Sequence, residues 1–139
     1  MVNREILIRR MTLLEEYLRD IEEVKEQTTF AKFTTDKVIQ RYVERTPQMA
    51  IEACLDMGKH IISFEGLREP GSNQEVFEVL GERGLFSGGL QKNLEQMVKF
   101  RNVLVYECNR VKAEIIFRLI HERLGDLREF AVIIGNTFF

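Results

Sequence analysis

One segment of the chain carries residue types that suit phosphate chemistry. Arg101 and Asn102 end a polar helical run, and Tyr106 and Cys108 follow a mostly apolar stretch. The planar guanidinium of Arg101 can hold two phosphate oxygens and stabilise charge that develops on them. Asn102 can orient a phosphate or cap a turn. Arg101 is therefore a candidate phosphate-binding residue, and the structural alternative is a salt bridge to a carboxylate of the same bundle such as Glu95.

Tyr106 and Cys108 are weaker candidates by their chemistry. A tyrosine titrates near ~10, so at neutral pH it donates a hydrogen bond but hardly serves as a base. A core tyrosine with its hydroxyl bonded at the rim is the alternative. Cys108 has no nearby His in the sequence, which favours a buried thiol over a nucleophile. Arg101 and Tyr106 are roughly 140° apart around a regular helix, which suits a site completed across a two-fold dimer.

The two histidines, His60 and His121, do not form a metal site. They fall in different predicted helices, and neither has a ligand-like spacing to a partner. His60 has apolar neighbours, as a histidine at the core boundary does, and His121 is expected to be exposed. Two histidines without clustered thiols or carboxylates do not hold a metal. We expect neither a metal nor a cofactor.

Apolar residues spaced by threes and fours predict a series of amphipathic helices. The first covers roughly residues 4 to 27. The second is capped by Asp36, ends near Gly66, and contains Pro47, which predicts a kink or a break before it. Residues 72 to 75 form a capping box that starts a short third helix. The predicted core positions of these helices are Leu7, Met11, Leu14, Leu18, Ile21, Ile39, Val43, Ala50, Ala53, Met57, Ile61, Phe64, Val76, Phe77 and Leu80.

Two further helical patterns complete the chain. The fourth starts at Leu90 and carries the Arg101 segment, with a weak break at Asn109-Arg110. The last ends at Gly135. No convincing strand pattern, internal repeat or low-complexity tract is present. Helix pairs with short connections build an all-α, up-and-down four-helix bundle with one extra short helix, which we predict to be one domain over residues 1–139.

Composition limits the class of protein. With 45% hydrophobic and 30% charged residues, the chain is globular and not disordered. A net charge of -2 gives no overall basic field for nucleic acid, although a local patch can hold a phosphate. No apolar run is long enough to span a bilayer, and the N-terminus lacks the shape of a signal peptide. Cys54 and Cys108 are expected to be reduced thiols. We therefore predict a cytoplasmic protein.

These segments together resemble the HepT-like branch of the HEPN superfamily. The active motif of that family reads Arg-Asn, an apolar run, His, any residue, Tyr, and Arg101-Asn102 occupies its first two positions. Tyr106 stands where the family has its His, and Cys108 stands where it has its Tyr. The likeness extends to three other parts of the family's fold. These are its long second helix, at residues 41–45 and 50–61, its short third helix and turn, at 76–80 and 84–86, and its closing helix, at 126–130.

The resemblance implies a dimeric helical bundle related to ribonuclease toxins. Active members are metal-independent ribonucleases, and their partner is a small nucleotidyltransferase that neutralises some of them by adenylylating the tyrosine of the motif. If the roles of the family's motif apply to this chain, Arg101 and Tyr106 are the catalytic residues, and Arg101 and Asn102 bind RNA phosphate. Metal-free cleavage needs a base on the 2′-hydroxyl, an acid on the leaving oxygen and positive charge at the phosphate. Replacing His by Tyr removes much of the base contribution, typically about 10²–10⁴-fold.

Three functions stay open at this point. The first is a toxin–antitoxin RNA endonuclease weakened or inactivated by its altered motif. The second is a non-catalytic substrate-binding or partner-binding subunit of a two-part nucleotidyltransferase system, and the third is a helical protein that keeps only its dimer interface. We expect a homodimer, and for the first two functions a minimal nucleotidyltransferase antitoxin as partner. The first function also requires RNA as a partner, and we expect no membrane partner for any of the three. The cysteine at 108 has no hydroxyl for the nucleotidyltransferase to adenylylate. Tyr106 is a poor substitute for that hydroxyl, because positions 106 and 108 lie about 200° apart around a helix.

Overall fold

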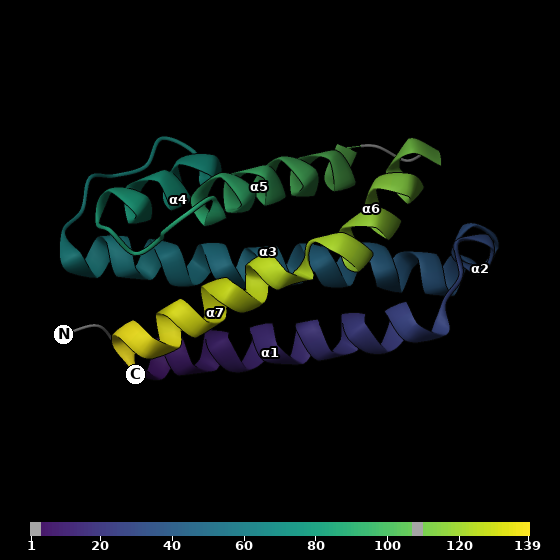
Figure 1. The fold of residues 1–139 in the computed structure, drawn as a ribbon, viewed down its shortest axis with the longest axis horizontal. Coiled ribbons are helices and arrows are strands. Elements are labelled where there is room, and N and C mark those ends of the chain that lie inside the picture. The colour runs from purple at the N-terminus through teal and green to yellow at the C-terminus, as the bar shows by residue number, and fades with distance from the viewer. Residues whose placement is uncertain (1–3, 107–109) are drawn as a thin grey trace.

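The computed structural model describes residues 4–106 and 110–139, apart from the side chains of 103–106 and 110–112. Within these ranges all regular structure is α-helical (Figure 1), which confirms the all-α prediction. None of the helices described has an apolar window long enough to cross a bilayer. The helices are α1 (Arg4–Gln27), α2 (Phe30–Thr35), α3 (Lys37–Glu65), α4 (Asn73–Glu82), α5 (Leu90–Tyr106), α6 (Arg110–Glu122) and α7 (Leu124–Phe138).

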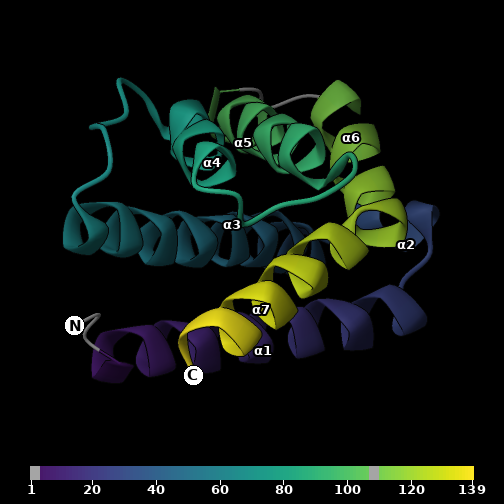
Figure 2. The same ribbon diagram turned by 60° about the vertical axis from the view of Figure 1, so that its left-hand side comes forward.

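Four helical runs lie along the long axis of the molecule in alternating directions, and the run of α5 covers only part of that length. In Figure 1, α1 runs from left to right, α3 returns, α5 runs to the right above α3, and α6 and α7 together lead back to the left. Figure 2 shows α7 crossing in front of the layer that α1 and α3 form, and α7 contacts both helices. α4 is the extra short helix that the sequence predicts, and α2 is a second one.

Helix α3 is the longest element, and its two ends lie where the sequence places them. The Asp36 side chain caps the start, since its Oδ1 accepts hydrogen bonds from the backbone N–H groups of Val38 (2.9 Å) and Ile39 (3.2 Å). Gly66 ends the helix in a left-handed conformation with φ 68°, and the N–H of Leu67 donates to the carbonyl of Ile62 at 3.0 Å. These bonds satisfy backbone groups that a helix end leaves without partners.

Pro47 lies inside α3, and the helix runs through it without interruption. Of the two outcomes predicted at Pro47, a kink or a break before it, the break does not occur. The proline lacks an N–H, so the Val43 carbonyl receives no helical bond from it. The buried Thr46 donates its hydroxyl to the Tyr42 carbonyl at 2.8 Å. Pro47 itself is buried, and burial of this turn against the core offsets the missing bond.

Three other boundaries differ from the prediction. A short helix, α2, forms in the Thr-rich interval, because Thr29 caps it through Lys32 N–H (3.2 Å) and Phe33 is fully buried. A helix of six residues is too short to show a repeating apolar pattern in the sequence. The last predicted helix is divided in two at Arg123, which leaves helical geometry with φ -119° and ψ 0°. Its second part continues past Gly135 to Phe138.

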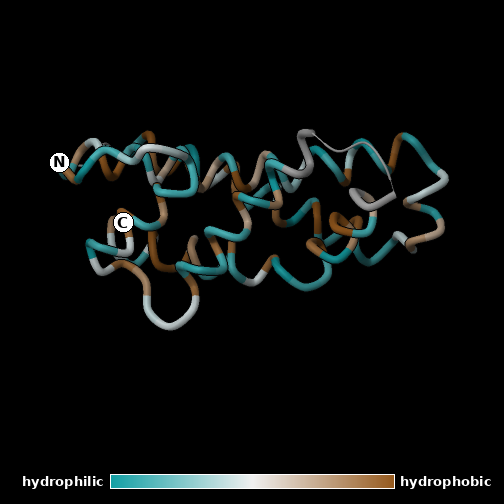
Figure 3. Tube along the Cα trace, turned by 90° about the horizontal axis from the view of Figure 1, so that it is seen from above, coloured by the Kyte–Doolittle hydropathy of each residue, from teal (hydrophilic) through white to brown (hydrophobic). Residues whose placement is uncertain are grey.

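The core matches the predicted apolar stripes closely. All five predicted positions of α1 are buried, and Figure 3 shows hydrophobic residues recurring at short intervals along the helices. Of the core positions predicted in α3, Ile39 is half-buried. The predicted burial of Phe64 is wrong, since this residue lies near the end of the helix and is 42% exposed. The predicted inward positions of α4 are confirmed, and α4 lies close to α3 because Gly58 leaves room for Val76.

We predict that Asp36→Ala lowers the free energy of unfolding by about 1 kcal/mol, because two N–H groups at the start of α3 lose their acceptor. Urea unfolding followed by circular dichroism measures the change. Asp36→Asn keeps an acceptor oxygen and is the matched control, with only a small expected loss. Equal losses in the two variants would show that the cap does not stabilise α3.

Candidate functional site

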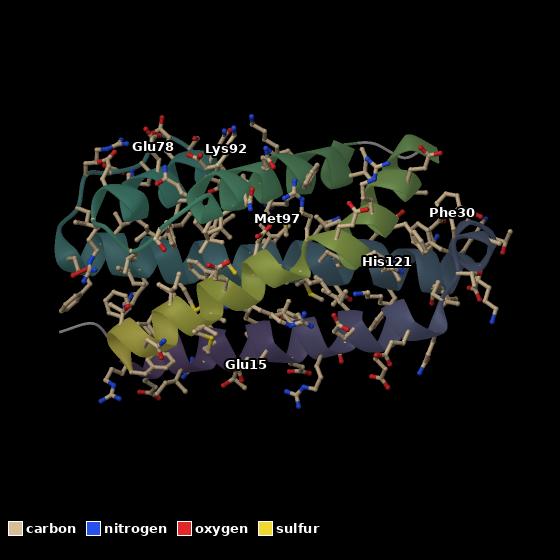
Figure 4. All side chains as sticks on the ribbon, in the orientation of Figure 1. Glu15, Phe30, Glu78, Lys92, Met97 and His121 are labelled. Atoms are coloured by element: carbon tan, nitrogen blue, oxygen red, sulfur yellow. The ribbon has the colours of Figure 1, made fainter. Side chains whose placement is uncertain are left out.

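Arg101 occupies a position of α5 that an apolar residue would be expected to fill. Leu90, Leu94 and Met97 form the buried stripe of this helix, and Arg101 follows at the same alternating spacing of four and three residues. Figure 4 labels Met97 between α5 and the layer of α3 and α7. Packing of this stripe carries the arginine inward, so only 23% of its side chain is exposed. The guanidinium is thus held at the edge of the core by helix packing.

Within the described part of the chain, the contacts of Arg101 leave much of its hydrogen-bonding capacity unused. Its Nη2 lies 3.5 Å from Oε1 of Glu52 on α3, and its Nη1 lies 3.4 Å from the amide oxygen of Asn102. Both distances exceed the usual range for an N–H···O bond. Its Nε is buried and has no hydrogen-bond partner within the part of the chain that the structure describes. A guanidinium held this loosely can bind an incoming anion.

A second arginine meets the same carboxylate from α3 itself. Arg45 Nη1 lies 4.0 Å from Glu52 Oε1 and 3.4 Å from Oε1 of Gln48. The Arg45 side chain is 60% exposed and that of Glu52 is 35% exposed. We refer to Arg45, Glu52 and Arg101 as the arginine–glutamate cluster. It contains two positive charges and one negative charge, which leaves one positive charge uncompensated within the cluster.

The predicted site residues have different outcomes. The salt bridge considered for Arg101 exists, but its partner is Glu52 and not Glu95. Asn102 lies within α5, exposed, and its side chain accepts from Arg101, so it does not cap a turn. Tyr106 is the last residue of α5, and its side chain lies outside the described residues. Cys108 lies outside them entirely.

The remaining candidate groups do not join the cluster. His121 is exposed, as predicted. Its Nδ1 lies 2.8 Å from the backbone carbonyl oxygen of Phe117, and its ring packs on the Phe117 ring with 4.3 Å between the ring centroids. His60 is half-buried on α3. Burial raises the pKa of the Cys54 thiol, which keeps it protonated and unreactive. No group of three or more metal-binding side chains lies within residues 4–106 and 110–139, so far as these are described.

Two residues of the cluster were not selected from the sequence. Neither Glu52 nor Arg45 is among the candidate site residues of the sequence analysis. Their spacing of seven is a usable signal, because it places both on one face of a helix two turns apart. The sequence does not say which neighbouring helix faces them, so the link to Arg101 requires the fold.

Comparison with known proteins identifies the family. The profile described as "Ribonuclease HepT-like" matches residues 14–134. The mRNA nuclease HepT of Shewanella oneidensis is 26% identical over 130 residues, which cover 94% of this chain and 96% of that protein. Both matches span the helices that carry the arginine–glutamate cluster.

Solved structures agree with this assignment. A tri-AMPylated HEPN toxin from Shewanella oneidensis, solved in complex with an MNT antitoxin, superposes with a TM-score of 0.85 at 26% identity and covers 94% of this chain and 97% of that one. The protein YutE of Bacillus subtilis, 21% identical, shares the fold with a TM-score of 0.83 and covers 97% and 90%. Because the family profile spans nearly all of the bundle, this chain belongs to the ribonuclease HepT-like family.

Proposed function

We propose that this protein is the ribonuclease toxin of a toxin–antitoxin pair, with activity weakened by its altered motif and a minimal nucleotidyltransferase as its antitoxin. The observation that carries the proposal is Arg101, a half-buried guanidinium with donors to spare, in a chain of the HepT-like family. The similar Shewanella oneidensis proteins, an mRNA nuclease and a toxin in complex with an MNT antitoxin, support it.

The chemistry separates into a part that this chain retains and a part that it has changed. Arg101 would hold the phosphate and stabilise the charge that develops during cleavage, with Asn102 beside it on the exposed side of α5. A tyrosine at position 106 has a hydroxyl that could donate a proton to the leaving oxygen. It cannot readily take a proton from the 2′-hydroxyl, which is why we expect slow cleavage.

We further propose that the whole chain forms one domain that acts as a homodimer through the part of α3 around Val38 and Tyr42, which leaves Arg45 and Glu52 outside the contact. Val38, Tyr42, Arg45 and Glu52 lie on one stripe of this helix, because their spacings are four, three and seven. The first two are apolar yet 78% and 43% exposed, and exposed apolar side chains gathered on one face are typical of interfaces. Contact there would place the two arginine–glutamate clusters in a shared cleft beside the interface.

The alternative function is a non-catalytic subunit that binds a nucleotidyltransferase or its substrate. The observation that favours it is Tyr106 at the position of the family's histidine, since the general base is lost while the bundle is kept. The two functions differ in one property, which is whether RNA is cleaved at all.

For the interface, we predict that the wild-type chain has twice its 16.3 kDa mass by light scattering at micromolar concentration, and that Val38→Glu makes it monomeric. A buried, unpaired carboxylate at the interface would be strongly unfavourable. Val132→Glu on α7, at a position 59% exposed, is the matched control and should stay dimeric. A monomeric wild type, or dissociation by the control variant alone, would contradict the proposed interface.

For the activity, we predict slow cleavage of single-stranded RNA by the wild type in the presence of chelator. Arg101→Ala should abolish cleavage, and Tyr106→His should raise its rate about 10²-fold or more, because a base is restored. Gel analysis of labelled RNA measures the rates. Arg9→Ala, which removes an exposed arginine paired with Glu5 at 3.6 Å, is the control and should cleave as the wild type does. Inactivity of both the wild type and Tyr106→His would favour the non-catalytic alternative.

A further inference from the structure

We propose that Arg45 is a second phosphate-binding residue and that the Glu52 carboxylate occupies the phosphate position in the free protein. The inference rests on the proposed function, since it assumes that RNA binds at Arg101. It adds Arg45 as a residue that binds the RNA phosphate and Glu52 as a residue that competes with the phosphate. Neither belongs to the motif on α5, and both come from α3.

The geometry of the shared carboxylate oxygen is the first observation. Oε1 of Glu52 is the atom that both arginines approach, with Nη2 of Arg101 at 3.5 Å and Nη1 of Arg45 at 4.0 Å. One anionic oxygen between two guanidiniums is the arrangement in which a phosphate oxygen would bind. Both distances are longer than the roughly 2.7–2.9 Å that is usual for charge-assisted hydrogen bonds. Glu52 therefore occupies the position without binding tightly.

The incomplete bonding of Arg101 is the second observation. Its Nε is buried and lacks a partner in the described part of the chain, and its two other contacts are long. A buried donor without an acceptor is unfavourable. Rotation of the guanidinium toward a phosphate, with its several oxygens, would improve the bonding of Arg101.

Exposure of the cluster makes exchange feasible. Glu52 is 35% exposed and Arg45 is 60% exposed, so the carboxylate can turn into water while a phosphate enters between the arginines. Gln48 holds Arg45 from one turn along α3 at 3.4 Å, which keeps that guanidinium near the site. RNA would then meet two positive charges where the free protein presents only one that is uncompensated.

The sign of one substitution tests this inference. Binding of a fluorescein-labelled, 2′-O-methylated RNA, which resists 2′-hydroxyl attack, is measured by anisotropy over a series of salt concentrations. Glu52→Gln should bind about threefold to tenfold more tightly, because the competing charge is removed. Arg45→Ala should bind more weakly by a similar factor, with the salt slope reduced by about one. Arg45→Lys keeps the charge and should restore part of the affinity.

A matched pair outside the cluster provides the control. Asp56 lies one turn beyond Glu52 on α3 and pairs with Arg10 of α1 at 3.7 Å. Asp56→Asn removes the same charge as Glu52→Gln, so it measures the effect of net charge alone. Arg10→Ala does the same for Arg45→Ala. Thermal unfolding of every variant checks that the helical fold is kept.

The outcomes separate this inference from the proposed function. Weaker binding by Glu52→Gln, or binding equal to that of Asp56→Asn, overturns the role given to Glu52. If Arg101→Ala weakens binding but Arg45→Ala does not, the inference about Arg45 fails while the proposed function stands. If Arg101→Ala leaves binding unchanged, the proposed function itself fails at its first step.

Discussion

The packing of α5 against α3 is the constraint on which the candidate site depends. Leu90, Leu94 and Met97 bury one stripe of α5, and the same stripe carries Arg101 to the edge of the core. There the arginine meets Glu52, which α3 supplies together with Arg45. Removing a charge from water is costly unless it is paired, so the half-buried guanidinium needs this carboxylate in the free protein. The same pairing leaves it available to another anion, because the contacts are long.

This arrangement separates binding from bond cleavage. The groups that would hold a phosphate come from two helices that the core fixes, and they remain in place whatever residue follows at the end of α5. In the proposed function, proton transfer would fall to Tyr106 at that end, the residue that the resemblance aligns with the family's histidine. A chain with these properties would bind RNA well and cleave it slowly. If Cys108 occupies the position of the family's tyrosine, as the resemblance implies, a nucleotidyltransferase antitoxin would find no hydroxyl there.

The sequence predicts the helices better than it predicts their meeting points. Asp36 and Gly66 bound α3 as expected, because capping is local chemistry that side-chain type reveals. The break considered at Pro47 does not occur, because burial of that turn outweighs the hydrogen bond that the proline removes. Helix α2 was missed because its stability comes from burial of Phe33, which stacks near Phe117 of α6. Such long-range contacts leave no local pattern.

The candidate site shows the same division. Arg101 could be selected from its segment, and a salt bridge to a bundle carboxylate such as Glu95 was its structural alternative. The fold supplies that carboxylate as Glu52, from another helix. Arg45 and Glu52 share a face of α3 by spacing alone. Only the packing of α5 on that face shows that they share a carboxylate oxygen with Arg101.

The most direct test of the account follows the arginine Nε–H signals of the protein by nuclear magnetic resonance as 2′-O-methylated RNA is added. Arg101→Lys and Arg45→Lys assign the two signals by their disappearance. We expect the signals of Arg101 and Arg45 to shift together and to saturate at one concentration of RNA, with Arg10 unchanged. RNA binding that shifts other arginines and leaves Arg101 unchanged would contradict the claim that this guanidinium is the phosphate-binding group.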